Sequence, residues 1–410
     1  MKSDLDAIMQ ARGLDALLIV GPTIHNPPMG YLTGGAILLS ADVLKKRGAD
    51  PVLYHHSMER GEAALSGLAT QSYDRFPMVE LLEQTQGDVI EAYALRYQKI
   101  LEAAGIQGGR LAIAGHVDVG LAFPVFQALT RRMPGLELVG EGEFSTLLQA
   151  MAIKDDDEVQ RIRRMGQISI QVMDLVADFL TSHRLKGEAL IEPDGQPLTI
   201  GSVKRRISLW LAERSAETPD DVIFAIGRDA ALPHSTGTPS DVLRLGQTIV
   251  FDIAPCEAGG GYFHDMTRTW CLGYASDEAL AVYEDVHAVF TQLRQELRPG
   301  AQCKAYQTRA CELFAQRGHP TICEDARTQR GYVHGLAHGV GLNVHERPDF
   351  SLRLANEDHL WPGSVTTLEP GLYYPERHIG VRLEDTLWVR PDGEIETLVE
   401  YPLDFVLPMR

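Results

Sequence analysis

The feature that most constrains the fold of this chain is a set of acidic residues inside strand-like apolar segments. Asp252 stands in the run TIVFDI, and Asp265 follows the glycine turn Gly259–Gly261. Glu369 and Glu384 lie in two further apolar runs of the same half. A buried carboxylate is costly unless it is paired or binds a metal ion. The pattern predicts an α+β domain with its strands around a polar centre, and a hairpin that places Asp252 beside Asp265.

A histidine-rich segment lies between the two pairs of acidic residues. Residues 334–348 carry His334, His338 and His345 among glycines, which permit close approach of the backbone. Two Asp, two Glu and one His form a ligand set that is mostly oxygen, and such a set suits Mn²⁺, Co²⁺ or Zn²⁺. Four carboxylates are more than one ion needs. The pattern therefore predicts two ions per chain that share bridging carboxylates, with a hydroxide between them.

Each of these residues also has an ordinary structural interpretation when it is taken alone. A single Asp in a strand usually pairs with an arginine, and Arg268 and Arg382 are available. A single His is usually hydrogen-bonded in the core or lies on the surface. The metal interpretation rests on the five residues together, in the order Asp-Asp-His-Glu-Glu.

The 410 residues are enough for two or three domains, and we predict two, covering residues 1–153 and 154–410. In the first, short apolar runs alternate with helical patterns, which predicts a smaller α/β layer domain. The predicted strands are Ala16–Val20, Ala36–Ser40, Pro51–Tyr54 and Leu111–Ala114, and the predicted helices are Ser3–Arg12, Val89–Ala104 and Leu121–Met133. This half carries little that indicates chemistry, and its histidines are expected in loops or on the surface. They are His25, His55, His56 and His116.

The second domain is predicted to begin with a long helix from Asp155 to Leu180. Four acidic residues open it, which suits the positive end of the helix dipole, and apolar residues then recur at helical spacing. Two more helices are predicted, one from the N-cap Ser276 to Arg298 and one over Cys303–Gln316. We expect the remainder of this half to be strand and turn.

Composition argues against several classes of protein. The net charge of −18 disfavours a nucleic-acid partner, because such partners need a basic surface. No apolar run reaches the ~18 residues of a membrane span, and acidic residues stand near the N-terminus where a signal peptide would be apolar. We expect a cytoplasmic protein without membrane contact. Its five cysteines, odd in number and without a CxxC pair, are expected to be reduced thiols.

Five stretches of the second half together resemble one known family. They are FDI at Asp252, HDMTRTW at Asp265, GLAHGVGLNVHERP at His338, TLEPGLYY at Glu369 and GVRLEDTLWV at Glu384. Their order resembles the superfamily of methionine aminopeptidase, aminopeptidase P, prolidase and creatinase, which share the pita-bread fold. The resemblance is close over residues 155–410 and weaker in the first part, where LDAL at Leu14 and YLTG at Tyr31 carry it. It implies a pita-bread catalytic domain preceded by a creatinase-like α/β domain.

The resemblance implies a role for each matching residue. Asp252 would hold one of two divalent ions, Mn²⁺, Co²⁺ or Zn²⁺. Asp265 and Glu384 would bridge both ions. His338 and Glu369 would hold the second ion. A bridging hydroxide would attack the scissile carbonyl, and Glu369 would also handle the proton.

Further matches lie on the substrate side of the implied site. His345 and His234 would contact the substrate and stabilise the tetrahedral intermediate, each for typically ~3 kcal/mol. His334 and Arg382 match positions near the substrate. The two aspartates are 13 residues apart, slightly more than is usual in the family. The extra residues fall in the glycine turn, where loops tolerate insertion.

The N-terminal domain narrows the reaction that the resemblance implies. Methionine aminopeptidases usually have only the catalytic domain, and creatinase shares both domains but lacks this metal set. Prolidase (Xaa-Pro dipeptidase) and aminopeptidase P remain, and both hydrolyse the bond before proline in small peptides. Two alternatives stay open: a peptidase without proline specificity, and a metal-free pita-bread domain that binds peptides. The resemblance also implies a homodimer.

Overall fold

The computed structural model describes residues 4–142 and 145–410, and contacts divide the chain into two compact units. The first unit runs to Met151 and includes Gly259–Gly261. The second holds Ala152–Ala258 and Tyr262–Arg410. The contacts place the boundary between the two units directly after Met151. The division into domains of residues 1–153 and 154–410 stays a prediction.

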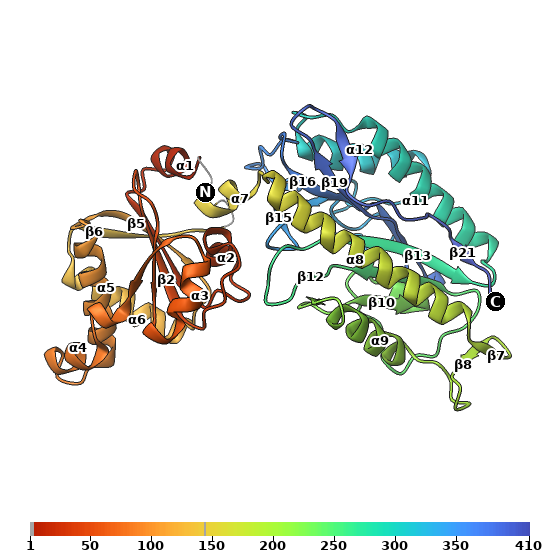
Figure 1. Cartoon of the computed structure of the whole chain (residues 1–410). Coiled ribbons are helices and arrows are strands. Elements are labelled where there is room, and N and C mark those ends of the chain that lie inside the picture. Colours follow the sequence, from red (N-terminus) through yellow and green to blue (C-terminus); the bar gives the residue numbers. More distant parts are fainter. Residues whose placement is uncertain (1–3, 143–144) are drawn as a thin grey trace. The chain divides into compact units, whose positions relative to one another are not determined.

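The first unit is an α/β layer built on one six-stranded sheet of order β4-β3-β2-β1-β5-β6 (Figure 1). Its strands are β1 (Ala16–Gly21), β2 (Ala41–Lys46), β3 (Val52–His55), β4 (Ala69–Ser72), β5 (Gly109–Gly115) and β6 (Leu136–Gly140). Its helices are α1 (Leu5–Ala11), α2 (Pro27–Thr33), α3 (Arg60–Leu65), α4 (Met78–Gln84), α5 (Val89–Ala103), α6 (Val119–Arg132) and α7 (Thr146–Met151), with 3₁₀ turns η1 (Ser57–Glu59) and η2 (Tyr73–Arg75). Only β2 runs against the other five strands, so the carboxyl ends of those five meet at one edge.

Most predicted elements of this unit are confirmed, but the strand Ala36–Ser40 is wrong, and Ser3 of the first predicted helix lies outside the described residues. The strand is β2, which begins directly after it and has the sequence ADVLKK. Asp42 and Lys45 of this strand are buried because tertiary partners satisfy them, and Lys45 Nζ donates to Asp6 Oδ1 at 2.7 Å. The expectation for His55 is also wrong, because this residue at the end of β3 is buried with 3% exposure.

The second unit packs helices against two sheets. Its helices are α8 (Asp156–Thr181), α9 (Ile200–Ala212), α10 (Gly227–Ala230), α11 (Asp277–Glu296) and α12 (Cys303–Gln316), with a 3₁₀ turn η3 (Pro375–Arg377). One sheet has the order β10-β11-β13-β21, with β10 (Ile223–Ile226), β11 (Thr248–Ile253), β13 (Met266–Leu272) and β21 (Val406–Leu407). The other has the order β15-β14-β16-β19-β20, with β14 (His338–Gly339), β15 (Glu346–Asp349), β16 (Val365–Leu368), β19 (Asp385–Val389) and β20 (Ile395–Thr397). Three short ladders join β7 (Arg184–Lys186) to β8 (Ala189–Ile191), β9 (Ala216–Glu217) to β12 (Cys256–Glu257), and β17 (Gly371–Tyr374) to β18 (Ile379–Arg382).

Apolar contacts fix the order of these layers. One core cluster joins α8 and α9 to β10, β11 and β13, and another joins α11 and α12 to β16 through β19. Figure 1 shows α8 along β13 and α11 beside α12. Among the described residues, no helix combines the length and apolar character that a membrane span needs.

The long helix, the two later helices and the central hairpin are confirmed. Asp155 and Glu158 form a capping box at the start of α8, and Ser276 caps α11. In the hairpin, Asp252 on β11 faces Thr267 on β13, and Asp265 immediately precedes β13. The expectation of only strand and turn elsewhere is wrong, because α9 covers residues 200–212. Its signals were a Thr199 N-cap and apolar residues at helical spacing.

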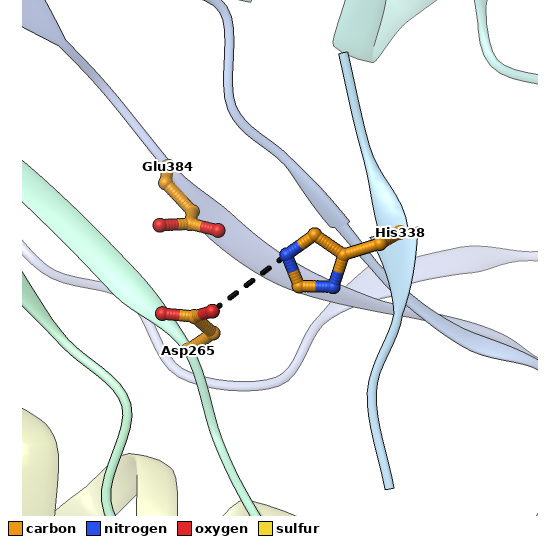
Figure 2. A group of neighbouring side chains, drawn as sticks. All are labelled: Asp265, His338 and Glu384. Carbon is orange, nitrogen blue, oxygen red and sulfur yellow. Dashed lines mark ion pairs between the residues drawn. The ribbon is translucent and has the colours of Figure 1, made fainter. Parts of the chain in front are cut away.

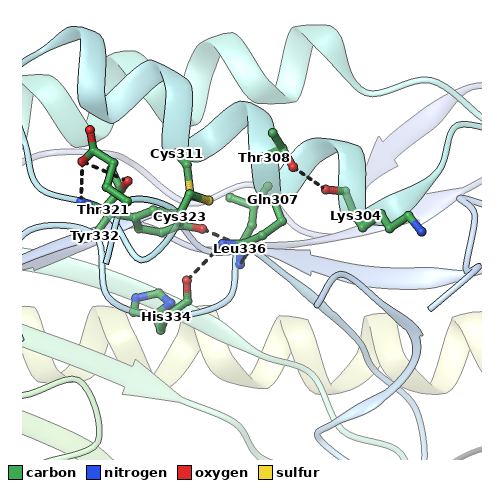
Figure 3. The surroundings of a disulfide bond; sticks show 10 residues. Lys304, Gln307, Thr308, Cys311, Thr321, Cys323, Tyr332, His334 and Leu336 are labelled. Carbon is green, nitrogen blue, oxygen red and sulfur yellow. Dashed lines mark hydrogen bonds between the residues drawn. A yellow bond between two sulfur atoms is a disulfide. The ribbon is translucent and has the colours of Figure 1, made fainter. Parts of the chain in front are cut away.

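The prediction of five reduced cysteines is wrong for two of them. Cys311 on α12 and Cys323 in the loop after it form a disulfide, with their Cα atoms 6.1 Å apart (Figure 3). Cys256, Cys271 and Cys303 are free and buried. Sequence spacing does not reveal that the loop after α12 returns to the side of that helix, so the pairing had no signal.

A buried carboxylate makes the stability of the first unit depend on pH. Asp42 is 6% exposed and accepts hydrogen bonds from Tyr73 Oη at 2.6 Å and Tyr97 Oη at 3.1 Å. Burial raises its pKa to about 6, while the two tyrosines, Arg96 and His56 act in the opposite direction. In the unfolded chain the carboxyl has its ordinary pKa of 3.8. The folded chain therefore holds this proton more tightly, and its stability falls as the pH rises from the unfolded pKa through the folded pKa.

We predict that Asp42→Asn removes this loss. Between about pH 4 and pH 7 the wild-type unit should lose roughly 3 kcal/mol of unfolding free energy that the variant keeps. Urea unfolding at both pH values measures the difference. Glu137→Gln, at an exposed carboxylate on β6, is the matched control and should behave as wild type. An equal pH dependence in wild type and Asp42→Asn would contradict the prediction.

Candidate metal centre

All nine residues that the sequence analysis placed at the site line one cavity of about 530 Å³ in the second unit. The metal-type residues are Asp252, Asp265, His338, Glu369 and Glu384, and the substrate-side residues are His234, His334, His345 and Arg382. Asp252, His338 and Arg382 lie on β11, β14 and β18, and the other six lie in loops or directly beside a strand. The bridge between Thr267 and Glu384 joins the β13 and β19 regions. The fold thus gathers segments that are far apart in the sequence.

Asp265, His338 and Glu384 form the centre of this cavity. One ligand atom from each lies within 4.8 Å of the others, and Figure 2 shows the three side chains pointing toward one another. His338 Nε2 is 3.7 Å from Asp265 Oδ2. The Nδ1 atom of His338 faces the Gly339 carbonyl at 3.1 Å, so Nδ1 carries the proton and Nε2 keeps its lone pair. This is the tautomer that a metal-ligating histidine needs.

Two carboxylate oxygens of the centre are buried without a partner. Asp265 Oδ1 and Glu384 Oε1 accept no hydrogen bond within the described part of the chain. The other oxygen of Glu384 accepts from Thr267 Oγ1 at 2.7 Å. Leaving a buried acceptor unsatisfied is costly, more so when it is charged. Unpartnered carboxylate oxygens beside a free imidazole nitrogen fit a divalent cation.

The electrostatics of the centre support the same conclusion. Burial, followed by repulsion from neighbouring carboxylates, raises the pKa of Asp265 and of Glu384 well above the usual range. Burial also raises the pKa of Glu369 to about 8. Burial lowers the pKa of His338 to about 3, which keeps the imidazole neutral and able to ligate. A bound cation would offset the repulsion among these carboxylates.

Glu369 and Asp252 complete the predicted ligand set in different ways. Glu369 Oε1 lies 3.5 Å from His338 Nε2, next to the central group. Asp252 Oδ2 lies 2.5 Å from Arg382 Nη2, so this aspartate is paired with an arginine. In this structure Asp252 therefore has the arginine partner that is usual for a single aspartate in a strand. Its side chain still lines the same cavity.

The second candidate arginine has another partner. Arg268 Nη2 pairs with Asp385 Oδ1 at 2.7 Å, and both side chains are buried. The same guanidinium donates to the backbone carbonyls of Thr267, Glu384, Tyr401 and Pro402. Arg268 therefore ties β13 to the β19 region and does not neutralise the predicted ligands.

Tyr373 links the predicted substrate-side residues and was missed by the sequence analysis. Its hydroxyl accepts from Arg382 Nη1 at 2.7 Å and lies 2.9 Å from His334 Nε2. Burial lowers the pKa of His334 to about 3, so this ring is neutral. Tyr373 lies within the matching stretch TLEPGLYY, but nothing in the sequence shows that its hydroxyl contacts Arg382 and His334.

The remaining predicted histidines lie at the cavity with exposed side chains. The His345 ring is 4.4 Å from the His338 ring in an edge-to-face arrangement, and His234 lines the same cavity. Two acidic loop residues, Asp220 and Asp221, also line it and were not predicted. Their loop is polar and matches none of the recognised stretches, so the sequence gave no reason to select them.

A buried glutamine of α12 positions the histidine segment. Gln307 Oε1 accepts from Leu336 N at 2.5 Å, and Nε2 donates to the His334 carbonyl at 3.4 Å (Figure 3). Leu336 in turn accepts at its carbonyl from Glu369 N at 2.8 Å. Gln307 therefore fixes the backbone that carries His334 toward the cavity. A single Gln within a helix pattern gives no sequence signal for this role.

The geometry defines a class of site, namely a buried, carboxylate-rich cavity of the kind that hydrolytic metal centres use. The model of metallopeptidase family M24 matches residues 160–391, more than half of the chain. The chain therefore belongs to metallopeptidase family M24.

Curated relatives are similar at moderate identity. An uncharacterized peptidase of Staphylococcus aureus (strain MRSA252) is 29% identical over 257 residues, covering 62% of this chain and 65% of the relative. A protein described as probable dipeptidase PepE of Mycobacterium bovis is 27% identical over 285 residues, covering 66% of this chain and 68% of the relative. The chain thus aligns with about two thirds of the length of these relatives.

Solved structures match almost the whole chain. A dipeptidase from Pyrococcus horikoshii OT3 superposes with a TM-score of 0.74 at 23% identity, covering 99% of both chains. A Xaa-Pro dipeptidase from Bacillus anthracis gives a TM-score of 0.76 at 20% identity, covering 98% of this chain and 97% of the other. These likenesses establish the fold, and they confirm the prediction of a pita-bread domain preceded by a smaller α/β domain.

We predict that the centre binds divalent metal through Asp265. Asp265→Asn removes one charge while it keeps the shape of the side chain, so Mn²⁺ affinity should fall at least ~100-fold. Calorimetric titration of metal-stripped protein with Mn²⁺ measures this without an activity assay. Asp392→Asn, in an exposed turn, is the control and should bind like wild type. Equal affinity of Asp265→Asn and wild type would remove Asp265 from the site.

We predict that Arg382 offsets the carboxylate repulsion in metal-stripped protein. Arg382→Met should lower the unfolding free energy in a chelator by about 3–5 kcal/mol, because it leaves Asp252 and its neighbours without their buried cation. Arg309→Met removes a more exposed ion pair and should cost at most about 1 kcal/mol. Urea unfolding of the three proteins tests this, and an unaffected Arg382→Met would refute it.

Proposed function

We propose that this protein is a metal-dependent peptidase that hydrolyses the peptide bond before proline, of the Xaa-Pro dipeptidase or aminopeptidase P type. The observation that carries the proposal is the single cavity lined by all five metal-type residues and all four substrate-side residues. Membership of metallopeptidase family M24 supports the peptidase class. The names of the structural relatives, a Xaa-Pro dipeptidase among them, support proline as the residue after the cleaved bond.

The proposal includes two divalent ions per chain, Mn²⁺, Co²⁺ or Zn²⁺. Asp265 and Glu384 would bridge them, Asp252 would hold one, and His338 and Glu369 would hold the other, as the family resemblance implies. Asp252 would then exchange its contact with Arg382 for a contact with metal. When bound, divalent ions supply Lewis acidity and a hydroxide nucleophile at neutral pH.

The residues of this chain would handle the substrate and the proton. Exposed His234 and His345 face the cavity, where an N–H from each can donate to the carbonyl oxygen that becomes negative during attack. Glu369 would take the proton of the attacking water and pass it to the nitrogen of the leaving proline. Arg382 is held by Tyr373 and Thr267, which keeps its charge close to the reacting group.

The proposal extends to the partners and the setting of the protein. Its substrates would be small peptides, and it would act as a homodimer in the cytoplasm without nucleic-acid or membrane partners. The strongly negative net charge supports the absence of nucleic acid. The cavity of about 530 Å³ supports short peptides, since it falls within the usual range for small-ligand sites.

We predict that the metal-loaded protein cleaves a Xaa-Pro dipeptide or a longer Xaa-Pro-Xaa peptide, and that Asp265→Ala lowers the rate by on the order of 10³-fold or more. Chromatography of the products with Mn²⁺ or Co²⁺ measures both. Asp392→Ala should keep wild-type activity. Cleavage of the dipeptide alone would identify a dipeptidase, and cleavage of the longer peptide an aminopeptidase P.

Two outcomes would overturn parts of the proposal. Equal cleavage of a matched dipeptide with alanine in place of proline would show a peptidase without proline specificity. Binding of peptides without cleavage by protein that contains its metal would favour a peptide-binding module. The module alternative predicts lost ligands, whereas all five metal-type residues are present and line one cavity.

A further inference from the structure

The first unit contains a cavity of its own, with a volume of about 370 Å³. It lies at the carboxyl ends of β1, β3, β4 and β5. Gly21, His56, Tyr73 and Val117, which stand at or just after these ends, line it. Helices α5 and α6 supply its other walls. In sheets with mainly parallel strands, ligands bind in the crevice outside the carboxyl ends. The size and place of this cavity are those of a small-molecule site.

The cavity is lined by a buried arginine that has no acceptor. Arg96 on α5 is only 8% exposed, and its guanidinium lies over the rings of Tyr73 at 5.0 Å and Tyr93 at 5.7 Å. No hydrogen bond or ion pair joins this guanidinium to any of the described residues, and its Nε atom is fully buried. A fully buried N–H group such as this one is costly without an acceptor. The arrangement leaves a fork of N–H donors for an acceptor that enters the cavity.

The nearest acid does not fill this role. Asp42 lines the same cavity, but Tyr73 and Tyr97 each donate to one of its oxygens, and no ion pair joins it to Arg96. The tyrosines therefore hold Asp42 in place. Arg96 keeps its capacity for a planar oxyanion, which a guanidinium binds through two parallel hydrogen bonds.

The lining side chains indicate the chemical character of the rest of the ligand. Aromatic and apolar side chains surround the arginine, and they are Met78, Tyr93, Tyr97, Leu121, Val125 and Phe126. Such walls suit a flat ring, which gains from offset or edge-to-face contacts as well as from burial.

The charges limit the ligand to a single negative charge. Arg96 is the one permanently charged cation among the lining residues, whereas Asp42 and Asp118 both carry carboxyl groups. A doubly charged phosphate would meet one cation and two acids, and like charges this close repel one another. A monocarboxylate matches the fork of Arg96 with less repulsion.

We propose that this cavity binds a small aromatic carboxylate, with its carboxylate on Arg96 and its ring among Tyr93, Tyr97 and Phe126. The proposal does not rest on the peptidase activity, because every lining residue belongs to the first unit. It assigns a ligand function to the half of the chain in which the sequence showed little chemistry.

Titration calorimetry of the full chain with phenylacetate tests this proposal. Wild type should bind with a Kd on the order of 1 mM or tighter, which is reasonable for so small a ligand. Arg96→Leu should weaken binding roughly tenfold or more, because it removes a charge-assisted pair of hydrogen bonds. Arg131→Leu, at an exposed arginine of α6 outside the cavity, is the matched control and should bind like wild type.

A second variant keeps the test decisive if Arg96→Leu folds poorly. Leu121→Trp, at an exposed wall position, should fill the cavity and abolish binding without burying a new charge. Phenethylamine, which has the same ring with a cationic end, should not bind. The proposal is overturned if wild type does not bind phenylacetate, if either variant binds as well as wild type, or if the amine binds better than the acid.

Discussion

The cost of burying several carboxylates in one cavity organises the second unit. Burial raises the pKa values of Asp265, Glu384 and Glu369. Repulsion from neighbouring carboxylates raises them further, and for Glu369 that neighbour is Asp252. Among the described residues that line this cavity, Arg382 is the one arginine or lysine, and Tyr373 and Thr267 hold it there. A cluster of this kind is unfavourable for an isolated fold. A divalent cation, which membership of family M24 implies, would offset this cost, and its binding energy would add to the stability of the fold.

The fold meets this requirement by bringing two sheets to one point. The β11–β13 hairpin supplies Asp252 and Asp265, β14 supplies His338, and the ends of β16 and β18 supply Glu369 and Glu384. Arg268 joins β13 to the β19 region through Asp385 and four backbone carbonyls, so the sheets cannot separate without exposing a buried charge. Arg268 thus has a structural role, whereas Arg382 lies in the cavity. The sequence could not distinguish these two roles.

The four acidic residues of this centre could be predicted from the sequence because each stands in an apolar segment, where a charge conflicts with burial. An aspartate within TIVFDI has few explanations, and five such stretches in a fixed order have fewer. The supporting residues carry no such conflict. Gln307 and Tyr373 fit their helix and strand, and only the tertiary structure brings them against the backbone of the histidine segment and against Arg382. β2 was missed for the related reason that Asp42 and Lys45 look like surface residues until their partners are known.

The cavity of the first unit also contains a buried charged group, but there the group is a cation. There the Nε atom of a buried arginine has no acceptor among the described residues, as Asp265 Oδ1 and Glu384 Oε1 of the second unit have no donor. The arginine was invisible in the sequence because Arg96 stands on an amphipathic helix, where an arginine is ordinarily solvated. Its burial follows from Tyr73 and Tyr93, which cover the guanidinium with aromatic faces instead of acceptors. Cation–π contacts lower the cost of the buried charge without using its N–H groups. A site built in this way stays stable when empty and still keeps its donors for a ligand.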